Sequence, residues 1–225
     1  DGRHVLVFNG EIYNYLELRQ DLVNNGTQFD TSSDTEVLLQ MLVQKGASAL
    51  GQLNGMFAFL FLATQTGKWI LGRDQCGLQH VYHAITPSGQ FLFASEIKAL
   101  LAHPEVQPEV NSAGLNHYFT FQFCLGNETL FRNINKLEAG HYLEGRGGKI
   151  NNEVRYWDAD FTVDEHHTEN YFIDKLHHLL EDSARLQIRS DVPLGAYLSG
   201  GLDSSTISCL ASQYLDGEIP LFTGK

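Results

Sequence analysis

The sequence predicts an α+β domain rich in strands up to about residue 160, followed by the beginning of an α/β domain. Two observations support this prediction. Residues 56–62 read Met-Phe-Ala-Phe-Leu-Phe-Leu, and a strand that is apolar on both sides is expected to lie inside a covered sheet. An amphipathic helix at residues 171–188 leads into a short apolar strand at 192–198, a glycine turn and a new helix, which is how an α/β unit begins.

The first 55 residues predict a strand, a helix, a short strand and a second helix. Residues 5–8 are apolar, and the apolar side chains of residues 16–23 fall on one helical face until an Asn-Gly dipeptide ends the helix. A short strand is expected at residues 29–31. Ser33 and Glu36 have the spacing of a capping box, so a second helix is expected to begin there.

Two hairpins and a short helix are expected next. Strand 56–62 turns through Thr-Gln-Thr-Gly into a partner at residues 68–72. A second hairpin joins residues 81–85 and 90–94 through Thr-Pro-Ser-Gly. Ser95 is then expected to cap a short helix that ends before a proline.

The rest of the first domain is expected to contain a helix at residues 113–119 and a strand at 141–144. Residues 145–164 are polar and rich in turn-forming residues, so the domain boundary is placed there. The prediction is a first domain at residues 1–160 and a second, unfinished domain at residues 165–225.

Composition excludes several classes of function. The 225 residues carry 15 basic and 27 acidic side chains, and the net charge of -12 argues against binding of nucleic acid or anionic membranes through general electrostatics. No apolar run is long enough to span a bilayer. Cys76, Cys124 and Cys209 are too scattered for a disulfide framework or a zinc site, which fits reduced thiols in the cytoplasm. The sequence opens without methionine or a signal peptide, so it is expected to be a piece of a longer protein.

A glycine- and serine-rich loop near the end of the sequence predicts an anion site. Residues 199–205 read Ser-Gly-Gly-Leu-Asp-Ser-Ser and stand between an apolar strand and a helix start. Such a turn directs backbone N–H groups and the positive end of the helix dipole at one point, which suits phosphate. The serine hydroxyls add donors, and Asp203 can bind Mg²⁺. The simpler alternative is a turn that opens an ordinary helix.

A second chemical stretch follows the first strand. The side-chain amide of Asn9 and the N–H of Gly10 form a reasonable pair of donors for the oxyanion of an acyl transfer. Glu11 and Asp34 are carboxylates that can hold an ammonium group. The alternative is structural, because Asn-Gly is a common turn dipeptide and Asp34 suits the first turn of a helix.

Five motifs occur along nearly the whole chain. They are Asn-Gly-Glu-Ile-Tyr-Asn at residues 9–14, Ser-Asp-Thr-Glu at 33–36, Leu-Asn-Gly-Met-Phe-Ala at 53–58, Phe-Ala-Ser-Glu-Ile-Lys-Ala-Leu at 93–100, and the loop at 199–205. Taken together and in this order, the motifs resemble glutamine-hydrolysing asparagine synthetase, and the last of them resembles the pyrophosphate loop of the ATP pyrophosphatase family.

The resemblance implies an αββα sandwich of the N-terminal-nucleophile type, a class II glutamine amidotransferase, followed by an adenine nucleotide α-hydrolase-like synthetase domain. The implied activity is that of a carbon–nitrogen ligase of asparagine biosynthesis. Ammonia from glutamine crosses a tunnel and displaces AMP from an aspartate adenylated with Mg²⁺ and ATP. Glutamine, aspartate and ATP are the implied small-molecule substrates. A homodimer is a possible oligomeric state.

The resemblance also assigns roles to residues. It implies that Asn9 and Gly10 form an oxyanion hole and that Glu11 and Asp34 bind the backbone groups of glutamine, with Asp34 taking the α-amino group. Asp203 is the implied Mg²⁺ ligand. The implied ATP- and pyrophosphate-binding residues are Leu198, Ser199, Gly200, Gly201, Leu202, Asp203, Ser204 and Ser205.

The sequence departs from the family pattern in ways that affect the expected activity. The family uses a cysteine at its mature N-terminus as nucleophile, but this sequence starts with Asp1 and its first cysteine is Cys76. Residues 80–83 read His-Val-Tyr-His where the family usually has Pro-Leu-Tyr-Tyr. The chain as given is therefore expected to be inactive. Two other interpretations stay open: an amidotransferase for a different carboxylate, on a sugar or a peptide, and a non-catalytic nucleotide-binding homologue.

Overall fold

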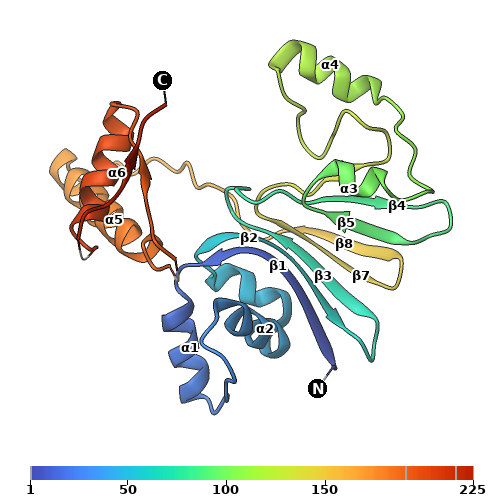
Figure 1. Cartoon of the computed structure of the whole chain (residues 1–225), viewed down its shortest axis with the longest axis horizontal. Coiled ribbons are helices and arrows are strands. Elements are labelled where there is room, and N and C mark those ends of the chain that lie inside the picture. The colour runs from blue at the N-terminus through green and yellow to red at the C-terminus, as the bar shows by residue number, and fades with distance from the viewer. Residues whose placement is uncertain (1, 191, 216, 225) are drawn as a thin grey trace. The chain divides into compact units, whose positions relative to one another are not determined.

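The chain divides into two compact units, which we describe separately (Figure 1). The computed structural model describes residues 2–190, 192–215 and 217–224. The first unit is Asp1–Ala159 and the second is Asp160–Lys225.

A five-stranded antiparallel sheet forms the centre of the first unit, in the order β1-β2-β3-β7-β8. The strands are β1 (His4–Ile12), β2 (Gly55–Ala63), β3 (Lys68–Arg73), β7 (His141–Arg146) and β8 (Lys149–Arg155). Along β2, Phe57 and Phe59 pack on one face and Ala58 on the other. The prediction of a strand that is covered on both faces is therefore confirmed.

The layers of the first unit are helices, sheet, sheet and helix, which confirms the predicted αββα arrangement (Figure 1). Leu38 and Met41 of the first helical layer are buried with Phe57 and Phe59 of β2. The first helical layer is α1 (Tyr15–Asn24), α2 (Asp34–Lys45) and the 3₁₀ turn η1 (Gly46–Gln52), and the second sheet is β4 (Tyr82–Ile85), β5 (Phe91–Ala94) and β6 (Asn135–Lys136).

The two sheets contact each other through aromatic and aliphatic side chains. The rings of Trp69 on β3 and Phe91 on β5 are stacked with their centroids 4.3 Å apart. On the far side of the second sheet, Leu100 of α3 (Ile97–Leu101) packs with Ala84 and Ile134. The remaining helix of this unit is α4 (Ser112–Phe121).

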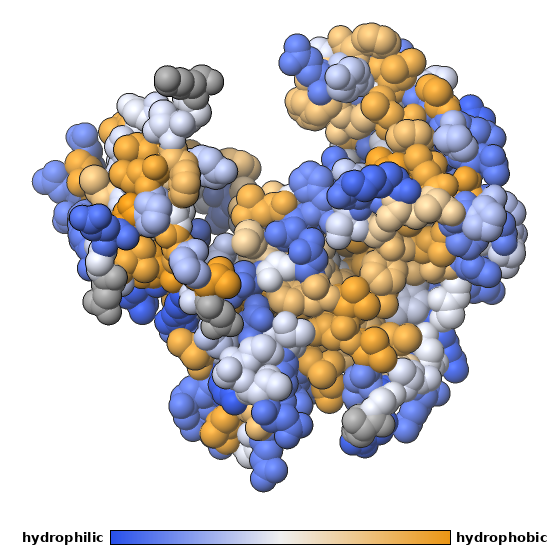
Figure 2. Space-filling view, in the orientation of Figure 1, coloured by the Kyte–Doolittle hydropathy of each residue, from blue (hydrophilic) through white to orange (hydrophobic). Residues whose placement is uncertain are grey.

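Part of the large sheet's surface is apolar and exposed. Val5 and Val7 on the edge strand β1 are 43% and 51% exposed. Figure 2 shows an apolar area over the strands of this sheet on the face turned to the viewer. Val7 also lines a cavity of about 330 Å³ between the sheets, together with Leu60 of β2 and Phe93 of β5.

The expected capping box is half correct. The Ser33 hydroxyl accepts a hydrogen bond from the N–H of Glu36 at 3.3 Å, so Ser33 is the N-cap of α2. The Glu36 carboxylate, however, accepts from the N–H groups of Asp30 and Thr31 at 2.9 and 2.7 Å. These two donors are thereby used locally, and the described residues 29–31 do not form the strand that was predicted there.

Two further differences concern strands. β1 does not end before Asn9 but continues to Ile12, because every residue from His4 to Ile12 has a partner on β2. β8 was not predicted. It is an edge strand with mostly exposed, polar residues, and such a strand lacks the apolar alternation by which strands are recognised.

The second unit contains one parallel strand–helix–strand connection, which confirms the predicted start of an α/β domain. Its elements are α5 (Glu169–Gln187), β9 (Ala196–Tyr197), α6 (Leu202–Ser212) and β10 (Leu221–Phe222). β9 and β10 pair in parallel and α6 connects them. The strand predicted at residues 192–198 is reduced to two residues, and Tyr197 is 86% exposed where a buried strand was expected.

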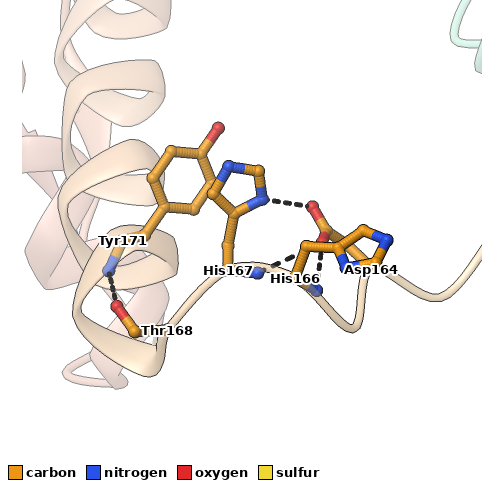
Figure 3. Close-up of polar contacts among 5 residues, drawn as sticks. All are labelled: Asp164, His166, His167, Thr168 and Tyr171. Carbon is orange, nitrogen blue, oxygen red and sulfur yellow. Dashed lines mark hydrogen bonds and ion pairs between the residues drawn. The ribbon is translucent and has the colours of Figure 1, made fainter.

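The start of α5 is fixed by local polar contacts (Figure 3). The Thr168 hydroxyl accepts from the N–H of Tyr171 at 3.3 Å and caps the helix. Just before it, the Asp164 carboxylate accepts from the N–H of His166 at 2.9 Å and from Nδ1 of His167 at 2.7 Å. The ring of His167 stacks on that of Tyr171, with centroids 3.8 Å apart.

No helix among the described residues is long and apolar enough to cross a bilayer.

Burial of His83 on β4 predicts a loss of stability in mild acid. The side chain is 8% exposed, and burial lowers the pKa of its imidazole to about 4 from the ordinary 6.5. As the pH falls from about 6.5 to about 4, the unfolded chain binds this proton first, so the folded state loses stability. At about 1.4 kcal/mol per pKa unit, the whole effect is about 3 kcal/mol.

We expect His83→Leu to flatten this part of the stability curve. Urea unfolding between about pH 4 and pH 7, followed by tryptophan fluorescence, measures it, because both tryptophans, Trp69 and Trp157, lie in the first unit. His178→Leu, which removes an exposed imidazole, is the control. The prediction is wrong if the acid-side slope of His83→Leu equals that of the unsubstituted chain.

Candidate functional site

The end of β1 brings together three of the predicted site residues. Asn9 and Glu11 are two positions apart on a strand and therefore point to the same face. Asn9 pairs with Ala58, whose side chain lies in the core between the two sheets, so this face is the one turned toward the second sheet. The Asn-Gly dipeptide is thus part of a strand and not a turn.

Gly10 is required by the close approach of the neighbouring strand. Its φ is +145°, and a Cβ atom at this position would lie 2.0 Å from the carbonyl oxygen of Met56. Gly55, across the same strand pair, is similar, because its Cβ would lie 2.2 Å from the carbonyl oxygen of Glu11. Only glycine at both positions permits this spacing of β1 and β2.

Asp34 lies next to this strand end. Its Oδ2 accepts a hydrogen bond from the N–H of Ile12 at 3.0 Å, and its Oδ1 accepts from the Thr35 hydroxyl at 3.2 Å. Asn14 joins the end of β1 to the segment before β2. Its Nδ2 donates to the carbonyl of Gln52 and its Oδ1 accepts from the N–H of Asn54, both at 2.9 Å. The structure therefore gathers Asn9, Gly10, Glu11 and Asp34 around one strand end.

The Asn9 side chain faces an open pocket of about 500 Å³. Its Nδ2 lies 3.1 Å from Oε1 of Gln79 and 3.5 Å from Oγ of Ser95. Other residues that line this pocket are Leu78, His80, Tyr82, Glu96 and Lys98. Asn9 and Ser95 also border the apolar cavity between the sheets.

Ser95 does not have the role predicted from the sequence. Glu96 is the N-cap residue of α3, and no side chain caps this helix. The helix begins one residue later than expected, and the Ser95 hydroxyl is directed to Asn9 instead of to the helix. Ser95 thus belongs to the pocket.

Two buried, charged side chains, those of the neighbours Arg73 and Asp74, organise the loop that carries Gln79. Asp74 is 1% exposed, and its carboxylate accepts from the N–H groups of Leu78 and Gln79, both at 2.9 Å, and from that of Phe57 at 3.2 Å. Arg73 is 5% exposed and donates to the carbonyls of Gln79, Leu137 and Gly77 at 2.7, 2.6 and 2.5 Å. Burial lowers the pKa of the Arg73 guanidinium, and the neighbouring Asp74 opposes this shift.

Sequence reasoning missed Gln79, Ser95 and the Arg73–Asp74 pair. A usable signal was present for the pair, because two charged residues directly after an apolar strand and before a glycine turn indicate a buried, hydrogen-bonded network. No signal connected Gln79 with Asn9, because the two residues are 70 positions apart and meet only through sheet packing.

The predicted pyrophosphate loop lies in the second unit and forms the first turn of α6. Gly200 has a φ of +81° and Gly201 is the N-cap residue. The hydroxyls of Ser199 and Ser204 are 3.0 Å apart, and Ser204 Oγ also accepts from the N–H of Ser199 at 3.2 Å. Ser205 donates to the carbonyl of Gly201 at 2.8 Å. The loop is therefore a short, hydrogen-bonded turn at a helix N-terminus.

The surroundings of this loop suit a ligand that brings its own charge. Leu202 is 82% exposed, and Leu198, the last residue before the loop, donates its N–H to the carbonyl of Phe222 on β10 at 2.8 Å. Asp203 is exposed in the first turn. Across the described ranges, no three His, Cys, Asp or Glu residues are grouped to hold a metal ion. A single carboxylate such as that of Asp203 can hold Mg²⁺ together with phosphate oxygens and water molecules, which is the common mode for this ion.

Comparison with known families gives a separate match for each of the two units. Residues 1–157 match the glutamine amidotransferase domain family. The chain belongs to this family. Residues 175–225 match the family described as asparagine synthase.

The curated relatives that this chain resembles include proteins named asparagine synthetase. Glutamine-hydrolyzing asparagine synthetase 3 of Bacillus subtilis (strain 168) is 34% identical over 98% of this chain and 36% of its own length. A putative asparagine synthetase of Mycobacterium tuberculosis (strain H37Rv) is 37% identical over 99% of this chain and 35% of its length. Asparagine synthetase B of Escherichia coli (strain K12) is 35% identical over 94% of this chain and 33% of its length. The chain thus spans about a third of the length of these relatives.

A solved structure, the glutamine phosphoribosylpyrophosphate amidotransferase of B. subtilis, superposes with a TM-score of 0.48 at 18% identity over 98% of this chain and 45% of its own length.

The nucleophilic cysteine that the family resemblance implies is not among the described residues of this site. Cys76 is exposed in the loop after β3, and Asp1 lies outside the described residues.

The glycine at the end of β1 gives a prediction about stability. Gly10→Ala should lower the free energy of unfolding by about 3 kcal/mol or more, because the new Cβ collides with backbone that cannot move without breaking the β1–β2 pairing. Gly26→Ala is the matched control: its φ is +88°, but nothing lies within 4 Å of the new Cβ.

The control variant should lose only about 1–2 kcal/mol from backbone strain. Urea unfolding followed by tryptophan fluorescence measures both variants. If Gly10→Ala and Gly26→Ala lower the free energy of unfolding equally, the close approach of β1 and β2 does not explain the effect of Gly10→Ala.

Proposed function

We propose that the first unit is the glutaminase part of a glutamine-dependent amidotransferase, and that the second unit begins an ATP-using domain that amidates aspartate to asparagine. The observation that carries the proposal is the Asn9 amide, which is held at the edge of a 500 Å³ pocket next to Gly10, with Glu11 and Asp34 at the same strand end. The family matches, in this order along the chain, support it.

The proposed roles in the first unit follow from the chemistry of amide hydrolysis. Attack on the side-chain amide of glutamine creates a negatively charged oxygen, which the N–H groups of Asn9 and Gly10 stabilise. Glu11 and Asp34 bind the charged backbone end of glutamine, and Asp34 takes the α-ammonium group. The attacking thiol would be a cysteine at the mature N-terminus of the complete protein, with its own amine as base, as the family resemblance implies.

The proposed role of the second unit is to bind the phosphates of ATP. Ser199 to Ser205 surround the N-terminus of α6, where backbone N–H groups and the helix dipole favour a pyrophosphate group. A Mg²⁺ ion bound by Asp203 and the phosphates would neutralise their charge. The aspartate carboxylate attacks the α-phosphorus of ATP and releases pyrophosphate, and ammonia then displaces AMP to give asparagine.

We also propose a cytoplasmic location for the complete enzyme. Cys76, Cys124 and Cys209 are all free, as is usual in a reducing compartment.

The complete gene product tests the proposal directly. With glutamine, Mg-ATP and aspartate it should form asparagine and AMP in equal amounts. Asn9→Ala should lower glutamine hydrolysis by about 100- to 1,000-fold, because one oxyanion donor is lost. Asparagine formation from added ammonia should be unchanged in this variant, which is the internal control.

Two results would count against the proposal in different ways. Glutamine hydrolysis without AMP release on addition of aspartate would point to another acceptor carboxylate. Absence of both reactions in the unsubstituted protein would favour a non-catalytic nucleotide-binding role.

The pyrophosphate loop gives a separate prediction. Asp203→Asn should lower AMP release by about 100-fold or more with either glutamine or ammonia as nitrogen source, because the loop loses its metal-binding charge. Glutamine hydrolysis should continue. Asp174→Asn, which removes an exposed carboxylate of α5 in the same unit, should leave AMP release unchanged. Equal effects of the two substitutions would show that Asp203 has no special role.

A further inference from the structure

We propose that Gln79 is a positioning residue for the Asn9 amide. Gln79 accepts one N–H of this amide and thereby holds the other toward the pocket, where the oxyanion forms. This inference rests on the proposed glutaminase function of the first unit.

The contact itself joins two distant parts of the chain. Nδ2 of Asn9, at the end of β1, lies 3.1 Å from Oε1 of Gln79, in the loop after β3. A side-chain amide nitrogen carries two hydrogens, and one of them is used here. Among the described residues, the second has only the long contact of 3.5 Å with Ser95 Oγ, which an oxygen of the substrate can replace.

The Gln79 oxygen next to this nitrogen also favours one orientation of the Asn9 amide. If the Asn9 side chain turned by half a rotation, its own oxygen would face Oε1 of Gln79, and the two oxygens would repel each other. Asn9 is exposed and its terminal torsion has two broad minima, so strand pairing alone does not choose between the two orientations. Gln79 supplies the missing constraint.

Gln79 can act as an anchor because its backbone is held at both ends. The carboxylate of Asp74 accepts from its N–H at 2.9 Å, and Nε of Arg73 donates to its carbonyl at 2.7 Å. Both charged side chains are more than nine-tenths buried, and each makes further hydrogen bonds to backbone. The Gln79 side chain therefore starts from a fixed point, which is what a preorganised donor site requires.

The experiment uses glutamine hydrolysis by the complete gene product. Gln79→Met keeps the length of the side chain but removes the acceptor oxygen. We expect kcat to fall about tenfold with KM within about twofold, because the oxyanion donor matters in the transition state and not for binding of glutamine. If the methionine variant is unstable, Gln79→Ala is used in its place, because this substitution removes the same oxygen.

Gln75→Met is the matched control. Gln75 lies in the same loop and is also partly buried, but its Nε2 donates to the carbonyl of Leu53 at 2.8 Å. This variant should keep kcat within about twofold of the unsubstituted enzyme, since it changes the loop without touching Asn9.

A double-mutant cycle separates positioning from a general structural effect. In an Asn9→Ala background, Gln79→Met should change kcat by less than about twofold, because the amide on which Gln79 acts is gone. A full tenfold loss in that background, or an unchanged kcat in Gln79→Met alone, would overturn the inference while the glutaminase function stands. An unsubstituted enzyme that does not hydrolyse glutamine overturns the proposed function, and the inference with it.

Discussion

The hydrogen bonds that the buried side chains of Arg73 and Asp74 make to the backbone are the interactions on which the site depends. Burying two charges is unfavourable unless their hydrogen-bonding groups are satisfied, and here the backbone of one loop does most of this. Asp74 also binds the N–H of Phe57, and its own N–H donates to the carbonyl of Phe57 at 2.8 Å. The pair therefore joins the loop to β2 and fixes where Gln79 lies.

The position of Asn9 has a second, independent origin in strand packing. Gly10 and Gly55 allow β1 and β2 to remain paired up to Ile12, and on this paired strand Nδ2 of Asn9 lies 3.5 Å from Oγ of Ser95. The oxyanion donor proposed here thus depends on two things at once, a pair of glycines that sets the backbone and a charged pair that sets the neighbouring loop. Gly55, Arg73 and Asp74 do not contact the substrate in the proposed reaction, whereas the N–H of Gly10 is itself one of the two proposed oxyanion donors.

The two proposed binding sites are built in different ways. In the second unit, the proposed phosphate-binding groups are the backbone N–H groups and hydroxyls of adjacent residues, in the loop at residues 199–205 at the start of α6. In the first unit, the proposed donors and carboxylates come from β1 and α2, and the side chains that contact the Asn9 amide come from two loops. A site made from neighbouring residues can be read from a motif, whereas a site made from separate elements needs the fold.

The sequence by itself determined both hairpins, the covered strand β2, the Ser33 cap and the glycine-rich loop, because each depends on residues that are close in the chain. It failed at β8, whose exposed edge position removes the apolar pattern, and at the end of β1, where a turn dipeptide lies inside a strand. Only the tertiary structure decided that Gln79 and Ser95 meet Asn9, because hydrogen bonds between residues 70 and 86 positions apart exist only after the sheets have packed.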